Sequence, residues 1–145
     1  MTQPRTIDLL LAQYAESHRH PTNELIHMVC VPVIVFSLLG ILWSVHPLLA
    51  LAASAAALYY YDRLSPPFAA GMLALALPML ALLALMPPMT VLPLSIAVFV
   101  VAWIGQFIGH KIEGKKPSFL DDLRFLLIGP LFVLGFLYRR LRFTY

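Results

Sequence analysis

The chain has 145 residues and a formal net charge of +3 at pH 7, and 61% of its residues are hydrophobic while 12% are charged. Because a soluble domain carries about 25% charged residues and cannot bury this much apolar surface, the composition excludes a water-soluble globular protein. The modest charge gives no reason to expect nucleic acid as a partner, and the single cysteine, Cys30, excludes an intramolecular disulfide.

The N-terminal segment has the pattern of an amphipathic helix that lies in the membrane interface. We expect Thr6 to cap this helix, Asp8 to suit its positive end, and the helix to end before Pro21. Charged side chains are spread over the first 24 residues, which argues against a signal peptide, so the first membrane segment is expected to remain as an anchor. The apolar side chains of the helix recur at i, i+3, i+4 and i+7, at Ile7, Leu10, Leu11 and Tyr14.

Two long uncharged stretches follow. Residues 25–61 and 64–110 contain no Lys, Arg, Asp or Glu. One membrane helix needs about 20 residues, so each stretch is long enough for two helices. Prolines interrupt both stretches, at His46-Pro47 and at Met86-Pro87-Pro88-Met89. The sequence therefore predicts an all-α integral membrane bundle, a single domain over residues 1–145, with four spans near 27–45, 47–61, 68–86 and 91–110.

The basic residues orient this bundle. Arg5 and Arg19 precede the first span, Arg63 lies between the second and third spans, and the other seven Lys and Arg follow the fourth. With four spans, all ten basic residues fall on one side, which the positive-inside rule assigns to the cytoplasm. We therefore expect a multi-pass protein with both termini cytoplasmic, in the inner membrane of a bacterium or in the endoplasmic reticulum of a eukaryote.

A fifth apolar stretch, Phe125 to Tyr138, is too short to span. Its residues make about 21 Å of helix, against a hydrocarbon core of about 30 Å. Spanning would also carry the three arginines that follow it to the wrong side. We expect this segment to be re-entrant or to lie against the bundle at the cytoplasmic face, broken near Gly129-Pro130.

Most of the histidines fall at the predicted cytoplasmic face, although only Lys and Arg set the orientation. Ionisable side chains near a bilayer are expensive to place, which makes them candidates for function. His46, beside Pro47, is expected in a loop on the other side. The four at the cytoplasmic face are His18, His20, His27 and His110.

The spacing of these histidines predicts two groups at one membrane depth. Pro21 separates His18 from His27, so His18 would end the interfacial helix and His27 would lie in the first turns of the first span. Asn23, four residues before His27, shares its helical face and is a candidate to orient the imidazole.

The second group lies at the end of the fourth span. Gln106, His110 and Glu113 follow one another at i, i+4 and i+7 and share one helical face. Glu113 would either bind a metal directly or hold a ligand in place, and Gln106 would assist the site without binding the metal. Asp62 also falls at this face; it is expected to pair with Arg63 or to assist the site from a distance.

Imidazole and carboxylate side chains in this arrangement point to a metal. Neutral imidazole is the commonest metal ligand in proteins, and histidines with a carboxylate and open positions suit non-haem iron(II). The same ligands would also hold zinc with a bound water. The alternative is that these are amphipathic side chains near water, without a metal. The ligand candidates are His18, His20, His27, His110 and Glu113.

Two motifs carry a resemblance to a known family. The first is Tyr14-x-x-x-His18-x-x-Pro21-x-Asn23-x-x-x-His27-x-x-x-x-Pro32, and the second is Trp103-x-x-Gln106-Phe107-Ile108-Gly109-His110-x-x-Glu113-x-x-x-Pro117. With these motifs the chain resembles the 2-hydroxy fatty acid dioxygenase family, small membrane proteins whose fungal member acts in phytosphingosine breakdown in the endoplasmic reticulum. The resemblance covers nearly the whole chain.

The resemblance implies an Fe(II)-dependent enzyme that removes one carbon from a long-chain 2-hydroxy fatty acid with O2 and without 2-oxoglutarate. The family's motif histidines correspond to His18, His27 and His110. His20 stands where many relatives are expected to carry Asn, which leaves open whether it is a ligand or a polar neighbour. The lipid substrate would lie with its tail in the bilayer, and its carboxylate and hydroxyl would meet the histidines at the interface.

Two other functions fit the same residues. A zinc hydrolase of lipid amides would use the same histidines and carboxylate, and the metal and the need for O2 separate it from a dioxygenase. A non-enzymatic lipid-binding membrane protein would keep its function after replacement of the histidines. A haem protein is disfavoured because the histidines lie at helix ends, and transport because no charged residue falls within the predicted spans. Chain-length preference and oligomeric state stay open.

Overall fold

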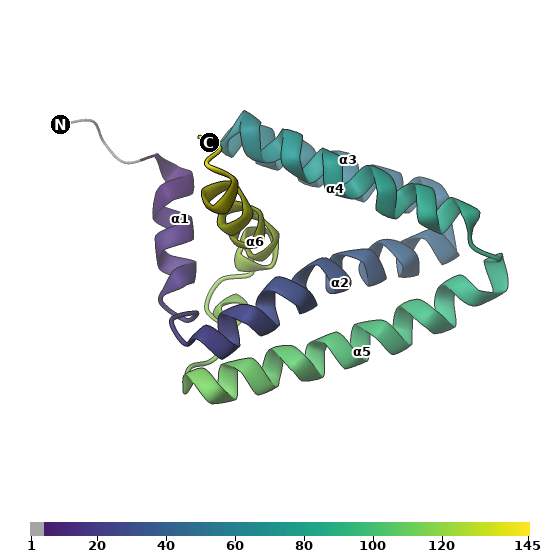
Figure 1. Ribbon diagram of the computed structural model, residues 1–145. Coiled ribbons are helices and arrows are strands. Elements are labelled where there is room, and N and C mark those ends of the chain that lie inside the picture. Colours follow the sequence, from purple (N-terminus) through teal and green to yellow (C-terminus); the bar gives the residue numbers. More distant parts are fainter. Residues whose placement is uncertain (1–4) are drawn as a thin grey trace.

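The computed structural model describes residues 5–145 and shows a helical bundle (Figure 1). Over these residues the secondary structure is entirely helical, which confirms the predicted all-α class. The elements in chain order are α1 (Thr6–Ala15), α2 (Pro21–Val45), α3 (Pro47–Leu64), α4 (Pro66–Leu85), α5 (Pro88–Glu113), the short 3-10 helix η1 (Ser118–Leu120) and α6 (Phe125–Leu141).

A proline begins each of the four long helices, at Pro21, Pro47, Pro66 and Pro88. At the first position of a helix the missing backbone N–H loses no hydrogen bond, and the fixed φ of proline suits the helix. Three of these helices begin before the predicted spans, most clearly α2, which starts at Pro21 instead of residue 27, whereas α3 begins at residue 47 as predicted. The predicted breaks at His46-Pro47 and around residues 86–89 are confirmed.

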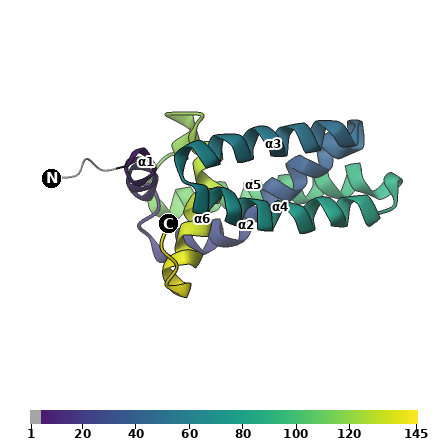
Figure 2. The same cartoon turned by 90° about the horizontal axis from the view of Figure 1, so that it is seen from above.

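The long helices form two pairs. α2 and α5 pack along each other, and α3 and α4 form a second pair that contacts α2 (Figures 1 and 2). Among the described helices, α2, α4 and α5 are long and apolar enough to cross a membrane. α3 has 18 residues and ends in Asp62, Arg63 and Leu64, so it is less apolar. Large apolar side chains cover the outside of the bundle, as expected where lipid is the solvent.

α2 and α5 approach each other closely at two glycines of α5. A Cβ atom at Gly105 would lie 2.8 Å from Cys30 Sγ, and one at Gly109 would overlap the side-chain amide of Asn23. Small residues allow membrane helices to pack at short distance. The pair Gly105 and Gly109 thus brings the last turns of α5 against the first turns of α2.

α1 confirms the predicted amphipathic helix, because all four of its periodic apolar side chains are buried. They pack against α6 at one end of the bundle. The prediction that Thr6 caps the helix is wrong: Arg5 is the residue before the first turn, and its side chain makes no capping bond. Instead the Arg5 guanidinium pairs with Asp8 (Nε to Oδ2, 2.8 Å), which holds this carboxylate at the start of the helix.

α6 corrects the prediction that the last apolar stretch is broken near Gly129-Pro130. It is one continuous helix with Pro130 inside it. An internal proline removes a helical hydrogen bond, but this part of α6 is tightly packed, with Ile128, Leu131 and Phe132 buried. Contacts of α6 with α1, α2 and α4 offset the loss. α6 crosses the end of the bundle instead of running along it (Figure 2).

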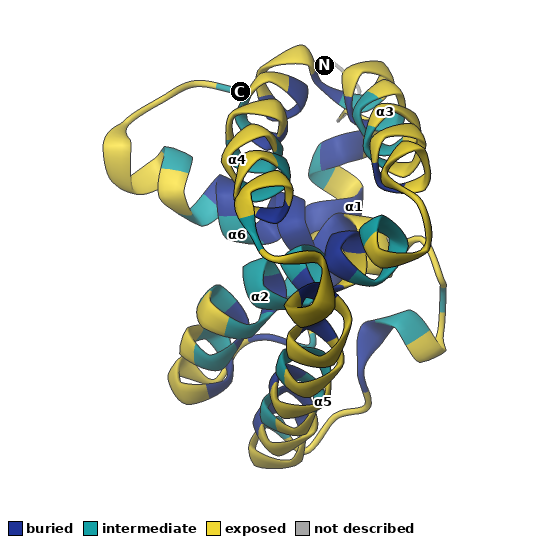
Figure 3. Ribbon diagram, turned by 90° about the vertical axis from the view of Figure 1, so that its right-hand side faces the viewer, coloured by how far each residue is buried: buried dark blue, intermediate teal, exposed yellow. Residues whose placement is uncertain are grey.

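Buried residues gather at the end of the bundle where α1, α2 and α6 meet, whereas α3, α4 and α5 present exposed faces (Figure 3). The connections between α2 and α3 and between α4 and α5 lie at the opposite end (Figure 1). We call the first end, which also carries the C-terminus, the packed end. It holds the residues that the sequence analysis selects.

Candidate metal centre

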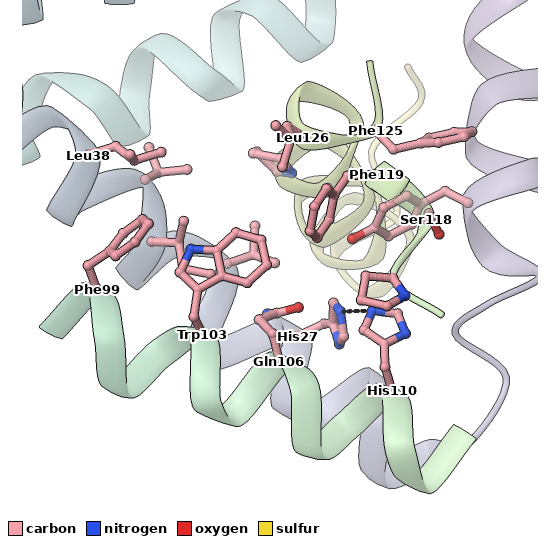
Figure 4. Close-up of a pocket in the computed structure, with 17 residues that line it drawn as sticks. His27, Leu38, Phe99, Trp103, Gln106, His110, Ser118, Phe119, Phe125 and Leu126 are labelled. Atoms are coloured by element: carbon pink, nitrogen blue, oxygen red, sulfur yellow. Dashed lines mark hydrogen bonds between the residues drawn. The ribbon is translucent and has the colours of Figure 1, made fainter. Parts of the chain in front are cut away.

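Three histidines that are far apart in the sequence meet at the packed end. His18 lies between α1 and α2, His27 lies near the start of α2, and His110 lies in the last turn of α5. Their exposed fractions are 4%, 1% and 5%. One nitrogen of each ring lies within 4.8 Å of the others. His27 Nε2 and His110 Nε2 are 3.2 Å apart, at one end of a cavity (Figure 4).

Backbone carbonyls set the tautomers of two of the three rings. His18 Nδ1 lies 2.7 Å from the carbonyl oxygen of Tyr14, and His27 Nδ1 lies 2.9 Å from that of Asn23. Because a carbonyl only accepts, each Nδ1 carries the proton and each Nε2 keeps its lone pair. Metal-ligating histidines are oriented by such partners in the same way.

The surroundings of His18 fix its ring and keep it neutral. The Tyr14 ring stacks on the imidazole, with centroids 4.1 Å apart and planes 8° from parallel. The Phe132 ring lies at 5.5 Å. Burial lowers the pKa of His18 and outweighs the opposing effects of the Tyr14 carbonyl and the Glu113 charge. The ring is therefore in the neutral form that binds metals.

Glu113 holds the loop before α2 against the end of α5. Its carboxylate accepts hydrogen bonds from the backbone N–H groups of Arg19 (3.0 Å) and His20 (2.8 Å) and from the side-chain amide of Asn23 (3.1 Å). The same amide also donates to a backbone carbonyl of the loop at 3.0 Å. These bonds position the loop that carries His18 relative to the two helices that carry the other histidines.

The remaining candidates from the sequence do not join the group of three histidine rings. His20 is exposed, and its ring accepts a hydrogen bond from the backbone at the start of α2. Asp62 is exposed near the end of α3 and does not line the cavity. Asn23 contacts His27 through its backbone carbonyl, whereas its side chain binds Glu113.

A cavity of about 240 Å³ lies beside His27 and His110, between α2 and α5 and next to η1 and the start of α6 (Figure 4). Near the histidines its wall includes the polar side chains of Gln106 and Ser118. The cavity therefore has a polar end at the histidines and an apolar body. The apolar wall includes Val31, Ile34, Leu38, Phe99, Phe119 and Leu126.

Three residues have roles here that the sequence did not predict. Tyr14 was expected on the apolar face of α1 and belongs to the first motif, but its stacking on the His18 ring was not predicted. Trp103 and Ser118 line the cavity. Trp103 precedes Gln106 by three residues, so extending the polar face of α5 by one turn would have found it. No signal in the sequence selects Ser118, because η1 reaches the cavity only through the path of the chain after α5.

The donor atoms of the three histidines fit a metal ion. His18 Nε2 and His110 Nδ1 are buried and have no hydrogen-bond partner in the part of the chain that the structure describes. An unpartnered polar atom in apolar surroundings is costly, and a cation bound among the three rings would satisfy His18 Nε2. Imidazole suits zinc, copper, iron and nickel, and three ligands leave positions for water or substrate.

These features define the class of the protein, a helical membrane protein with a buried three-histidine group that could hold a metal at one end of its bundle. The model of the family described as 2-hydroxy-palmitic acid dioxygenase Mpo1-like matches residues 5–141, and the chain belongs to this family. It is also 33% identical over 132 residues to the 2-hydroxy-palmitic acid dioxygenase MPO1 of Saccharomyces cerevisiae. The matched region covers 86% of this chain and 75% of the yeast protein. No solved structure matches the chain.

Proposed function

We propose that this protein is an iron(II)-dependent dioxygenase that shortens long-chain 2-hydroxy fatty acids by one carbon with O2. The observation that carries the proposal is the meeting of three buried histidines, of which His27 and His110 line the polar end of an otherwise apolar cavity. Membership of the family and the name of the yeast relative support the substrate class.

In this proposal His18, His27 and His110 hold the iron. Iron(II) on three imidazoles would supply the positions for O2 and for an oxygen-rich head group. Other groups of the chain position these ligands. Two backbone carbonyls orient the rings of His18 and His27, and Glu113 holds the loop before α2 against α5. In this proposal Glu113 and His20 are not ligands. Glu113 holds the loop through a hydrogen bond from the His20 N–H, and the His20 ring caps the start of α2.

The cavity orients the substrate. The wall that α2 contributes continues from His27 through Val31 and Ile34 to Leu38, so it becomes apolar with distance from the histidines. A long-chain acid would lie with its head at the histidines and its tail along this wall. Apolar walls also exclude water from the reacting carbons, which limits side reactions.

The reaction balances with O2 as the sole co-substrate. In acid form, 2-hydroxypalmitate and one O2 give the fatty acid one carbon shorter, one CO2 and one water. The bond between C1 and C2 breaks, C1 leaves as CO2, and C2 is oxidised from an alcohol to a carboxylic acid. O2 accepts the electrons, so no further reductant is needed.

We also propose that the packed end faces the cytoplasm and that the whole chain is one membrane domain. All ten Lys and Arg lie before α2, at the end of α3, or from the last turn of α5 onward. These segments lie at the packed end (Figure 1). The positive-inside rule then places the histidines at the cytoplasmic face, in a bacterial inner membrane or in the endoplasmic reticulum.

An assay of O2 consumption and product tests the proposed reaction. The detergent-purified chain, loaded with Fe(II) without air, is expected to convert 2-hydroxypalmitate to pentadecanoic acid when O2 is admitted, and to leave palmitate unchanged. Zinc-loaded protein is expected to be inactive on the hydroxy acid. Release of a fatty acid from a lipid amide by zinc-loaded protein would favour the hydrolase, and absence of O2-dependent conversion would contradict the proposal.

A further inference from the structure

The cavity beside the histidines carries hydrogen-bond groups that find no partner within the described residues. They are Gln106 Nε2, Trp103 Nε1 and Ser118 Oγ, each with negligible exposure. Gln106 and Ser118 are only 5% and 6% exposed as whole residues. In apolar surroundings each unpartnered group is costly. Their gathering in the wall of one cavity points to a ligand that satisfies them.

These groups lie close to the histidines. Trp103, Gln106 and His110 follow one another at i, i+3 and i+7 on α5, so they share the face that lines the cavity. η1 contributes Ser118, and its next residue, Phe119, packs edge-on against the Trp103 ring with centroids 5.1 Å apart. Figure 4 shows Gln106 between the Trp103 ring and the histidines.

The polarity of the wall changes along the cavity. Among residues 5–145 its lining contains no Lys or Arg, so a carboxylate would be met by neutral donors next to the histidines. Beyond Trp103 the wall consists of side chains such as Phe99 and Leu38, which offer no hydrogen bond. This gradient fits an amphiphile with a short, oxygen-rich head and a long apolar tail.

We propose that Gln106 and Ser118 bind the carboxylate and 2-hydroxyl head of the substrate, and that the Trp103 N–H donates to the same head from the tail side. This inference rests on the proposed function and adds the residues that select a 2-hydroxy acid over a plain fatty acid. A ligand without the 2-hydroxyl group leaves one of these buried groups unpaired. Such unpaired groups are the usual source of strong discrimination between substrates.

Ligand binding without turnover tests this assignment. In a Trp43→Phe background Trp103 is the sole tryptophan, because the chain has two, and Trp43 does not line the cavity. The full-length protein is titrated in detergent, without O2, with 2-hydroxypalmitate, palmitate and hexadecane. The hydroxy acid is expected to shift Trp103 emission to longer wavelength and to bind about ten-fold more tightly than palmitate.

Substitutions separate head-group binding from damage to the cavity. Gln106→Leu and Ser118→Ala are each expected to weaken binding of 2-hydroxypalmitate about ten-fold while hexadecane binds as before. Gln106→Glu keeps the size of the side chain and opposes the substrate carboxylate, so it should lose the hydroxy acid and retain hexadecane. Ser95→Ala is the matched control, because Ser95 is another buried α5 residue with an unpartnered hydroxyl but lies outside this cavity.

The outcomes distinguish this inference from the proposed reaction. Unchanged affinity for 2-hydroxypalmitate in the Gln106 and Ser118 variants, or equal weakening for hexadecane, would overturn the head-group assignment even if the wild type consumes the substrate. Selective loss of the hydroxy acid in these variants would support the assignment even if the wild type does not oxidise it. If the wild type does not oxidise 2-hydroxypalmitate, that failure contradicts the proposed reaction but leaves the head-group assignment intact.

Discussion

The two ends of the α2 and α5 pair are built differently. At the packed end the helices meet through polar side chains, and Asn23, His27, Gln106 and His110 are all buried there. At the opposite end the pair meets α3 and α4 through a small apolar cluster that includes Leu39, Leu83 and Val91. Burial of polar groups is expensive, whereas apolar packing follows general rules for helices. The buried polar side chains of the packed end are therefore the ones that we expect to matter for function.

The largest expected effect comes from loss of a histidine at the packed end. His27→Ala removes one of three candidate ligands, so we expect loss of bound metal and at least about a 100-fold loss of turnover. Metal content and O2-dependent product formation measure both effects. His46→Ala is the matched control at the opposite end, where His46 caps α3 by accepting from the Leu48 N–H. It should lower stability by about 1 kcal/mol and keep metal and activity.

Glu113→Gln is expected to have the next largest effect. It keeps the size of the side chain and removes the charge that receives three hydrogen bonds from the loop and from Asn23. Partners that orient ligands contribute about 10–100-fold to metal affinity, so we expect a loss in that range with some turnover retained. Titration against a competing chelator measures it. Complete loss of metal would show instead that Glu113 is itself a ligand.

Gly105 and Gly109 of α5 allow helix packing near the histidines to be separated from metal binding. Gly109→Ala would push a Cβ into the Asn23 amide, and we expect a loss of about 1–3 kcal/mol in stability together with weaker metal binding. Gly105→Ala would press on Cys30 instead, so it should destabilise the protein without changing metal affinity. Cys30→Ala should then restore stability to the Gly105 variant. Thermal unfolding in detergent and metal titration would show whether the two glycines differ in this way.

The smallest effect is expected on the lipid-facing surface away from the histidines. Leu85, at the end of α4, is 84% exposed. Leu85→Ala should change the free energy of unfolding by less than about 0.5 kcal/mol and leave metal affinity unchanged. A large change in metal content in this variant would mean that the two ends are more strongly coupled than their separate clusters indicate.

Local signals in the sequence account for most of the fold. Uncharged stretches and prolines predict the long helices and their breaks, because both signals lie within one continuous segment of the chain. The exact starts differ, since Pro21 begins α2 and does not merely end the preceding segment. The continuous α6 depends on packing that offsets Pro130, and packing between distant segments is invisible in a local pattern.

The candidate site was predicted in part for the same reason. The distribution of Lys and Arg brings His18, His27 and His110 to one face, and the structure places their nitrogens within 4.8 Å of one another. Spacing alone does not separate a ligand from a residue that holds a loop, so the sequence left both roles of Glu113 open, and the structure shows the three hydrogen bonds that its carboxylate accepts. Ser118 depends on the path of the chain after α5, which no periodic pattern describes.

Metal content of the protein tests the central claim most directly. The wild type and His110→Ala are purified in detergent without air, and their metals are measured together with the protein concentration. The account predicts about one iron per wild-type chain and its loss in the variant, because three imidazoles hold the ion. Zinc in the wild type would contradict an iron dioxygenase, and equal metal content in both proteins, or none in either, would contradict the proposed centre.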